Sequence, residues 1–321
     1  MSLVKNDFIL YGFTFFLLVS LSQGAEYVSP ETSFGHPDLQ GTYTFRTLTP
    51  MQRPAELGER DKLSPEEAEE WAAYENRRQN RDLIIDSVGG ENYPPGVISY
   101  NEFWYERGDQ TVKDRRTSLI VSPANGRIPE LTEAALERRK QRAAIAELSL
   151  GPEARPYAER CLVTRTAGPP MQPGSYNLNV QFVQTENYFM ILNEMIHNAR
   201  IVRMNATHRE GPALVWEGDS VGHWENDTLV IETRNFLKGT AFADSTPSMK
   251  LIERITRVGP DTLTYEFTVE DPDTWSSPWT ALIPMRRLDN RIFEYACHEG
   301  NRGLHGVLAG IRRLQLEAGS D

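Results

Sequence analysis

Residues 251–270 read LIERITRV-GPD-TLTYEFTVE, two runs of β-forming residues around a turn at Gly259–Asp261. In the second run, apolar side chains such as Leu263 and Phe267 alternate with threonine and glutamate. Alternation with a period of two is typical of a β-strand that has one buried face and one wet face. This stretch therefore predicts a β-hairpin within an antiparallel sheet.

Three more pairs of β runs surround this hairpin in the second half of the chain. Each pair is separated by a short turn that contains Asn or Asp. The pairs are Val180–Gln184 with Tyr188–Glu194, Val221–Glu225 with Thr228–Thr233, and Trp279–Arg287 with Arg291–Ala296. Four successive hairpins predict an up-and-down antiparallel meander of about eight strands. Because closure removes exposed edge strands, we expect the meander to close into a lipocalin-like barrel or to curl into a sandwich.

The N-terminal half adds two predicted helices. Ser64 caps the first, with a proline at the first helical position and Glu67 three residues after the cap. This pattern predicts a helix near residues 65–81, and a run rich in Ala, Glu and Arg predicts a second helix near residues 132–148. The fold class is thus mainly β, with two helical insertions in a single domain of residues 25–321.

The chain begins with the pattern of an export signal. Lys5 precedes an apolar run over residues 8–21, and small residues follow at the positions that a signal peptidase reads. The run is shorter than the roughly 20 residues that a membrane-spanning helix needs, which leaves a membrane anchor as the weaker alternative. We therefore expect residues 1–24 to be a cleaved signal peptide. The mature chain is expected to be periplasmic or secreted, without membrane insertion.

The charge of the chain limits its partners. The formal net charge is −11 at pH 7. Nucleic acids and anionic membranes select basic surfaces, so neither is an expected partner. The sequence has none of the glycine-rich patterns that bind nucleotide phosphates, and we expect no cofactor. A small-molecule ligand or substrate is the partner that we expect.

The chain has two cysteines, Cys161 and Cys297. In the oxidising compartment that an export signal implies, such a pair is expected to form a disulfide. Two free thiols, or a metal shared between the cysteines, are the alternatives. Neither cysteine lies in a CxxC pair, which disfavours a zinc site.

Several short stretches resemble a family of exported bacterial β-rich proteins. They are Gly35–Leu39, Tyr100–Tyr105, Asn193–His197, Gly218–Ser220, Tyr265–Pro272 and Tyr295–Asn301. They include the motifs NEMIH, YEFTVEDP and YACHEGN and span most of the mature chain, so the resemblance is specific. It implies no settled reaction and no established catalytic residues. The meander also resembles lipocalin-type barrels, some of which are enzymes for hydrophobic small molecules, but that likeness concerns the fold and does not fix a function.

Two of these motifs place histidine beside acidic residues. Histidine titrates near neutral pH, so it can serve as a general acid or base. Our hypothesis brings two histidines to one mouth of the barrel, where a neighbouring glutamate orients an imidazole. The predicted catalytic residues are His197, Glu194, His298 and Glu299. In the alternative interpretation, each histidine simply bonds a backbone carbonyl at the end of a strand.

Further polar and aromatic residues are predicted to bind substrate. Asn193, Tyr265, Tyr295 and Arg254 can donate hydrogen bonds to a developing oxyanion. Trp279 can stack on an aromatic ligand. Packing inside the barrel or under the helices is the alternative role for these aromatic side chains.

Metal and nucleophile chemistry are less favoured. The four predicted catalytic side chains could form a nitrogen–oxygen metal site, but their spacing matches no compact motif such as HExxH, and we expect no metal. Gly218–Gly222 has the terminal glycines of a nucleophile elbow, yet no helix pattern follows Ser220.

Two functions are open from the sequence. The first is an exported enzyme that uses His/Glu acid–base chemistry on a small, hydrophobic molecule, as a lyase, isomerase, hydratase or hydrolase. The second is a non-catalytic, lipocalin-like protein that binds a small molecule. They differ in what a histidine substitution does: an enzyme loses turnover, while a carrier keeps its affinity because apolar burial supplies it.

Overall fold

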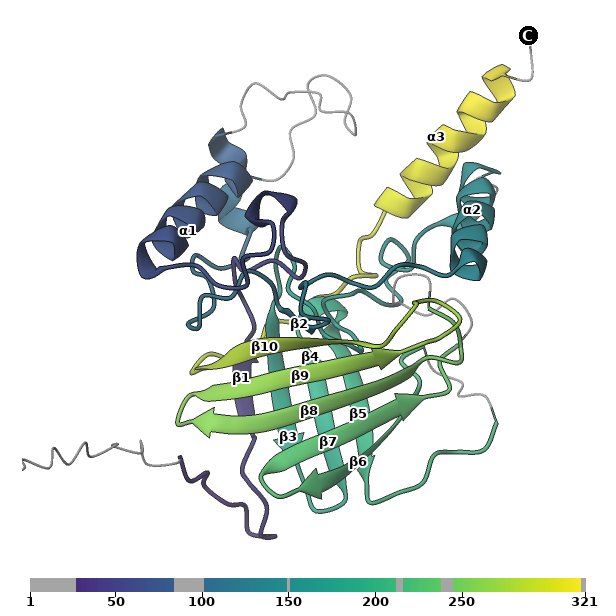
Figure 1. The fold of residues 1–321 in the computed structure, drawn as a ribbon. Coiled ribbons are helices and arrows are strands. Elements are labelled where there is room, and N and C mark those ends of the chain that lie inside the picture. Colours follow the sequence, from purple (N-terminus) through teal and green to yellow (C-terminus); the bar gives the residue numbers. More distant parts are fainter. Residues whose placement is uncertain (1–26, 84–100, 149–150, 212–215, 238–244, 319–321) are drawn as a thin grey trace, which may run out of the picture.

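The computed structural model of the chain describes residues 27–83, 101–148, 151–211, 216–237 and 245–318. The described residues form mainly β-structure together with three helices (Figure 1). The predicted signal peptide, residues 1–24, lies outside the described residues. Among the helices that the structure describes, none combines the length and the apolar character needed to cross a membrane.

Nine strands form a closed barrel. In order around the barrel they are β1 (Gly41–Thr44), β3 (Asn179–Gln184), β4 (Tyr188–Asn193), β5 (Asn198–Met204), β6 (Asp219–Glu225), β7 (Thr228–Arg234), β8 (Lys250–Gly259), β9 (Thr262–Glu270) and β10 (Trp279–Leu288). The barrel closes where β1 pairs with the end of β10, with Tyr43 opposite Arg287. A further short strand, β2 (Ile120–Ser122), pairs with the beginning of β10. The predicted mainly β fold with a lipocalin-like barrel is confirmed.

The barrel departs from an up-and-down meander at one seam. β5, which is not predicted from the sequence, runs parallel to β6 and pairs with it through Arg203 opposite Val221 and Met204 opposite Gly222. The hairpins β3–β4, β6–β7 and β8–β9 are present as predicted. The prediction of a fourth hairpin is wrong. Residues 291–296 form no strand, and β1 pairs with β10 instead. Residues 291–296 leave the sheet because they are bound at the end of the barrel, by a hydrogen bond and by the disulfide that follows them.

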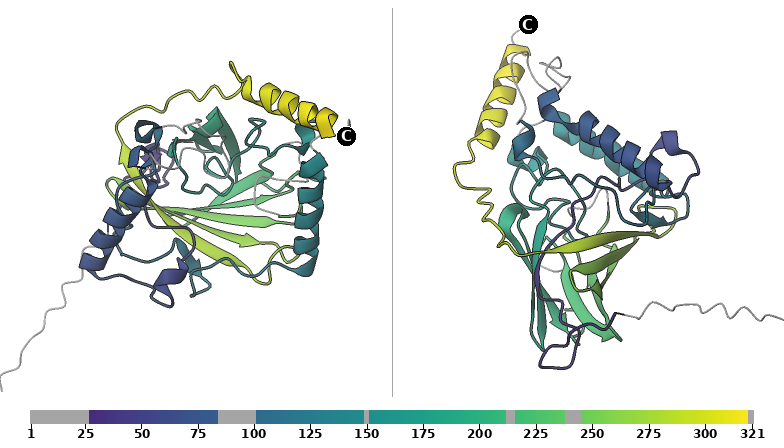
Figure 2. Two further views of the ribbon diagram at one scale, coloured as in Figure 1. Left: turned by 90° about the horizontal axis from the view of Figure 1, so that it is seen from above. Right: turned by 90° about the vertical axis from the view of Figure 1, so that its left-hand side faces the viewer.

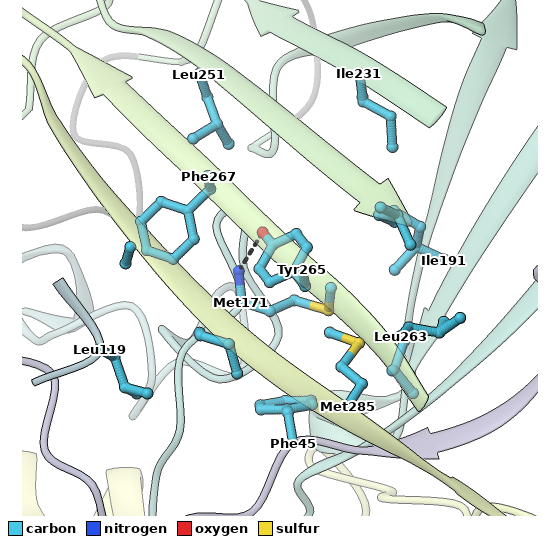
Figure 3. Packing of buried hydrophobic residues seen from close by; sticks show 14 of the residues in the cluster. Phe45, Leu119, Met171, Ile191, Ile231, Leu251, Leu263, Tyr265, Phe267 and Met285 are labelled. Atoms are coloured by element: carbon cyan, nitrogen blue, oxygen red, sulfur yellow. Dashed lines mark hydrogen bonds between the residues drawn. The ribbon is translucent and has the colours of Figure 1, made fainter. Parts of the chain in front are cut away.

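Bulky side chains fill the interior of the barrel. The inward-facing side chains of β9, which include Leu263 and Phe267, are fully buried, as the alternation in the sequence predicts. They pack with Phe45, Met285 and other apolar residues of the surrounding strands (Figure 3). Met171, from the segment between the second helix and β3, joins the same cluster. Side chains thus occupy the space in which a lipocalin-type ligand would lie.

Three helices lie at one end of the barrel, which we call the helical end (Figures 1 and 2). They are α1 (Pro65–Gln79), α2 (Glu133–Leu148) and α3 (Gly303–Ala318). α1 begins with the predicted capping box, in which Ser64 Oγ accepts from the Glu67 N–H (3.1 Å) and the Glu67 carboxylate accepts from the Ser64 N–H (2.8 Å). α2 follows Thr132, whose Oγ1 accepts from the Ala135 N–H (3.1 Å). The first two helices match the predicted ones, while α3 is additional.

Candidate functional site

The predicted site residue Glu194 lies at the helical end, directly after β4. Its side chain is 1% exposed, and its carboxylate accepts three hydrogen bonds. The donors are Asn177 Nδ2 (2.8 Å), Asn179 Nδ2 (3.0 Å) and the Phe293 N–H (3.1 Å). The buried carboxylate therefore joins the beginning of β3, the end of β4 and the segment that follows β10. This satisfies a buried charge by hydrogen bonds rather than by an ion pair.

The turn after Glu194 has an unusual backbone. It forms the 3₁₀ element η5 (Met195–His197), in which Ile196 and His197 both have a φ of 53°. The left-handed region is uncommon for residues other than glycine, and it is most costly for a β-branched residue such as isoleucine. The His197 N–H donates to the Glu194 carbonyl (3.1 Å), and His197 is exposed. Such strain persists where the surrounding structure fixes it, and it is enriched at functional sites.

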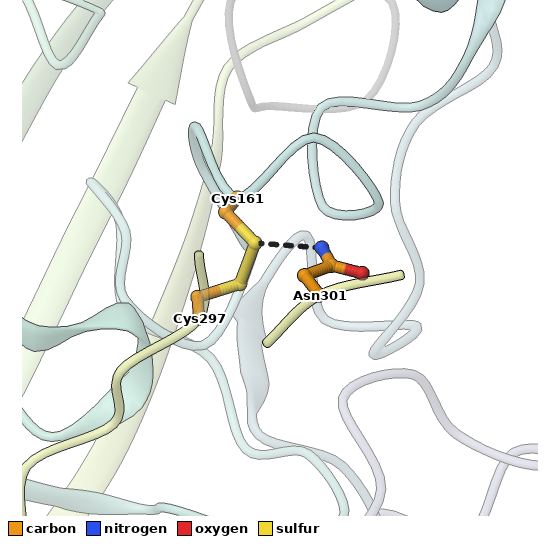
Figure 4. The surroundings of a disulfide bond; sticks show 3 residues. All are labelled: Cys161, Cys297 and Asn301. Carbon is orange, nitrogen blue, oxygen red and sulfur yellow. Dashed lines mark hydrogen bonds between the residues drawn. A yellow bond between two sulfur atoms is a disulfide. The ribbon is translucent and has the colours of Figure 1, made fainter. Parts of the chain in front are cut away.

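The predicted disulfide between Cys161 and Cys297 is present (Figure 4). Asn301 Nδ2 lies 3.5 Å from the Cys161 sulfur, on the same short segment as Cys297. The bond fastens the segment after β10 to the segment before β3. His298 and Glu299, which follow Cys297 directly, are exposed on this fastened segment.

The structure does not build the predicted pairing of an imidazole with a carboxylate. Within the described residues, neither His197 nor His298 is hydrogen-bonded through its ring to Glu194 or Glu299. Both oxygens of Glu194 accept from other donors, as described above. Glu194 is nevertheless linked to the segment of His298 through the Phe293 N–H. The catalytic roles of these residues stay predictions.

The predicted substrate-binding residues lie in different places. Asn193 is buried at the helical end and donates to a backbone carbonyl there (2.8 Å), and Tyr295 is half-buried on the segment after β10. Tyr265 and Trp279 are at most 1% exposed inside the barrel. Arg254 lies on the outer wall, where its guanidinium pairs with a glutamate carboxylate of β6 (2.7 Å). These five side chains therefore do not face one common surface.

A buried polar network inside the barrel is not predicted from the sequence. Arg200, 5% exposed, donates through both Nη atoms to the Glu253 carboxylate (2.5 and 2.8 Å). Its Nη1 also lies 3.4 Å from Ser220 Oγ and 3.3 Å from Thr233 Oγ1. Tyr265 Oη donates to Glu253 (2.6 Å). The network links β5, β6, β7, β8 and β9 through side chains that are at most 5% exposed.

The network keeps Tyr265 in its neutral form. Burial raises the pKa of the Tyr265 hydroxyl well above its ordinary value, and the negative charge of Glu253 raises it further. The hydroxyl also accepts from the Met171 N–H (3.1 Å), so both of its hydrogen-bonding roles are filled. A sequence signal exists for this network, since Glu253 lies between Leu251 and Ile255 on the inward face of β8. A charged residue at such a position requires a buried partner.

A second polar cluster, which we call the His208 cluster, lies on the outer wall beside the β5–β6 seam. His208 Nδ1 is 3.1 Å from Asp219 Oδ2, and His208 Nε2 is 3.0 Å from Glu232 Oε1. Asp219 also accepts from Arg203 Nη2 (2.9 Å) and from the Arg209 N–H (2.9 Å). Burial alone raises the pKa of Asp219, but the Arg209 N–H, His208 and Arg203 outweigh burial and lower it. The His208 cluster thus stabilises the β5–β6 seam from the outer face, where few backbone residue pairs join the two strands.

An open hollow of about 350 Å³ lies beside α1, and we call it the α1 hollow. Its lining residues are Glu56, Leu57, Arg60, Leu63, Glu67, Glu70, Trp71 and Tyr74. The leucines are buried and form an apolar floor, in one small cluster with Trp71. The rings of Trp71 and Tyr74 have centroids 5.7 Å apart and planes at 44°. The sequence indicates that these two aromatic residues share one side of the helix, but it does not indicate what faces them.

The α1 hollow is tied to the body of the protein by hydrogen bonds. The Leu63 N–H donates to the Arg115 carbonyl (2.9 Å), and the Arg115 guanidinium donates back to the Leu63 carbonyl (3.2 Å). Thr117 donates through Oγ1 to the Arg60 carbonyl (2.6 Å) and through its N–H to the Asp61 carbonyl (2.9 Å). Residues 60–63 are therefore held against the segment that leads into β2.

Comparison with known proteins gives no match to a protein-family model and no match to a curated protein. In the ranges that the structure describes, no three His, Cys, Asp or Glu side chains are grouped so that they could hold a metal ion. The geometry of the described sites is therefore the basis for a functional proposal.

Proposed function

We propose that the mature chain is an exported protein that binds a small, largely apolar molecule in the α1 hollow. The observation that carries the proposal is the lining of this hollow, in which Leu57 and Leu63 form an apolar floor beside Trp71 and Tyr74. Small-molecule sites are concave, span roughly 300–1,000 Å³, and combine apolar and aromatic walls with a few polar groups. The α1 hollow falls in this size range, and half of its eight lining residues are apolar or aromatic.

The rigidity of the α1 hollow supports the proposal. The capping box fixes the first turn of α1, and the hydrogen bonds to Arg115 and Thr117 fix the opposite wall. A preformed site loses less conformational entropy on binding than a mobile one, which favours affinity.

Export is part of the same proposal. The disulfide between Cys161 and Cys297 is of the kind that persists in oxidising compartments and is rare in the cytosol. Together with the signal-peptide pattern of residues 1–24, it favours a periplasmic or secreted protein.

A ligand inside the barrel is the less favoured version of small-molecule binding. Residues such as Tyr43, Phe182 and Phe267 occupy the interior and are at most 1% exposed. Admitting a ligand would require these packed side chains to move, at the cost of the contacts that they make with one another.

Titration with N-phenyl-1-naphthylamine, a neutral apolar fluorophore that brightens in apolar surroundings, tests the proposal. We expect saturable binding to the mature protein. Replacing Tyr74, which is 46% exposed and lies outside the buried leucine cluster, by alanine is expected to raise the Kd at least about fivefold. The Trp71→Leu variant is expected to raise it further.

The matched control is Trp104→Leu, which removes an exposed tryptophan that is not part of the α1 hollow. This variant should bind the dye as the unmodified protein does. Dye binding that survives both changes in the α1 hollow, or that is lost equally in the control, would contradict the proposed site.

An acid–base enzyme at the helical end is the second candidate function. The specific observation in its favour is the left-handed backbone of Ile196 and His197, next to the buried Glu194 and the disulfide-fastened segment of His298. Its hydrolase form predicts turnover of p-nitrophenyl butyrate, with a loss of at least about tenfold in kcat for His197→Ala or His298→Ala and unchanged thermal unfolding. Equal rates in both variants and the unmodified protein would contradict it.

A further inference from the structure

We infer that the ligand of the α1 hollow is an organic cation, of the alkylammonium or quaternary ammonium class with apolar substituents. This inference rests on the proposed function and specifies the charge of the ligand. Two features of the lining carry it: the excess of carboxylates, and the aromatic rings beside them.

The carboxylates of the α1 hollow are not all neutralised. The lining contains three glutamates and one arginine, which gives a formal charge of −2. Arg60 Nη1 donates to Glu67 Oε1 (2.6 Å), and the other oxygen of Glu67 accepts from the Ser64 N–H (2.8 Å), so these two charges offset each other. In the described part of the chain, Glu56 and Glu70 form no ion pair, and Arg78, which interacts with Glu56 at longer range, is itself paired with Glu75 (2.7 Å). Two negative charges are thus left at the rim of an apolar hollow.

The rings of the α1 hollow favour a cation as well. The faces of tryptophan and tyrosine carry negative partial charge and attract a cation that lies within about 6 Å of the ring. Trp71 and Tyr74 both line the hollow, with ring centroids 5.7 Å apart, so a cation in the hollow can lie near both rings. Its alkyl groups would lie against Leu57 and Leu63 on the floor.

Ligands of other charge fit the lining less well. An anion would meet the carboxylates of Glu56 and Glu70 at close range, which costs energy even at a hydrated surface. A neutral apolar molecule would gain the contacts with the floor but not the attraction of the carboxylates and rings. The overall charge of −11 also raises the local concentration of cations around the protein.

Three molecules of nearly the same shape but different charge test the inference: choline, 3,3-dimethylbutan-1-ol and 3,3-dimethylbutanoate. Each is used to displace N-phenyl-1-naphthylamine from the mature protein at low salt. We expect choline to compete about 5- to 30-fold more strongly than its neutral analogue, which corresponds to the usual strength of a cation–aromatic contact. The carboxylate should compete least.

The double variant Glu56→Gln with Glu70→Gln shows whether these carboxylates create the preference. It should still bind N-phenyl-1-naphthylamine, and the advantage of choline over the alcohol should fall at least threefold. Glu69→Gln, an exposed change on the same helix outside the lining, is the matched control and should keep the full preference.

The outcomes separate the inference from the proposed function. If the dye binds through Trp71 and Tyr74 but the three competitors act equally, the proposed small-molecule site is supported and the inference of a cationic ligand is contradicted. If choline keeps its advantage in the double variant, Glu56 and Glu70 do not create the preference, and the part of the inference that rests on these carboxylates is contradicted. If the dye does not bind and choline does not protect the protein against thermal unfolding, both are contradicted.

Discussion

Arg200 and Arg254 carry the same guanidinium into opposite environments. Arg200 pairs with Glu253 inside the barrel, where the two side chains are 5% and 0% exposed. Arg254, the next residue after Glu253, points to the outer wall and pairs with Glu225, where the side chains are 39% and 46% exposed. The alternation of a β-strand thus puts two consecutive charges on opposite faces. Burial decides how much each ion pair contributes to the free energy of unfolding.

Alanine at Arg200 is expected to destabilise the protein by about 3–5 kcal/mol, because it leaves the buried charge of Glu253 without a partner. Alanine at Arg254 is the matched control and should cost less than about 1 kcal/mol, since water screens an exposed pair. Equilibrium unfolding in urea measures both values. Similar losses in the two variants would contradict the inward orientation of Arg200 and Glu253.

Single residues also show which features of the fold can be predicted from the sequence. The alternation in residues 262–270 is local, so it correctly predicts that Leu263 and Phe267 are buried. The partner of Tyr265 is not local, because Glu253 comes from the neighbouring strand and Arg200 from a strand much earlier in the chain. A search for oxyanion donors therefore selects Tyr265 for its hydroxyl, while the fold uses that hydroxyl inside its core.

Among the described strands of the barrel, β5 and β6 are joined by the fewest backbone residue pairs. Two backbone residue pairs join these strands, whereas β8 and β9 pair along almost their whole length. Side chains support the seam on both faces, through Arg200 inside and through the His208 cluster outside. Asp219 takes part in the outer support with a side chain that is 5% exposed.

Asp219→Asn is expected to destabilise the protein by about 1–3 kcal/mol at pH 7, since hydrogen bonds to a charged group are lost. The pKa of Asp219 is lowered from its ordinary 3.8 in the folded protein. Its charged form therefore stabilises the fold above about pH 4, and this contribution is lost as the pH falls through the lower, folded-state pKa. The difference between the unmodified protein and the variant should shrink below pH 4.

Urea unfolding at a series of pH values measures this difference. Glu225→Gln is the control on the same strand, because its carboxylate is exposed and the change should have little effect. A difference for Asp219→Asn that grows as the pH falls would contradict the sign of the pKa shift.

Elements differ in how clearly the sequence indicates them. α1 and the three correctly predicted hairpins carry their own caps and turns, which act over a few residues. β5 forms a hairpin with β4, but the turn between them, residues 194–197, contains none of the Gly, Asn or Asp residues that mark a hairpin in the sequence, and β5 then joins β6 in parallel. β1 and β10 are far apart in the chain, so the residues around Tyr43 give no local sign that they close the barrel.

At the scale of the whole molecule, the disulfide encloses most of the barrel. Cys161 precedes β3 and Cys297 follows β10, and the two cysteines are 136 positions apart. The cysteines could be paired from the sequence because the chain has two of them and begins with the pattern of an export signal. The sequence does not indicate that the bond also fastens the segment that leads to α3. Its removal should therefore have a local effect as well as a global one.

The double variant Cys161→Ala with Cys297→Ala is expected to lose about 5 kcal/mol of unfolding free energy, the value that loop-closure entropy gives for a loop of this length. Amide hydrogen exchange should rise most in residues 289–302 and in α3, and least in β8 and β9. A variant as stable as the oxidised protein, or exchange that rises equally everywhere, would contradict this description of the C-terminal segment.

The most direct test of the α1 hollow as the ligand site is an NMR titration of the indole N–H signals with choline. The chain has six tryptophans, and they report on the hollow, the barrel core and other surfaces at once. Trp71 lines the hollow, whereas Trp275 and Trp279 are buried in the core. A saturable shift confined to the Trp71 signal, assigned by its absence in Trp71→Phe, is the result we predict. Shifts of the Trp275 and Trp279 signals, with no shift of the Trp71 signal, would place the ligand inside the barrel and contradict the proposed site.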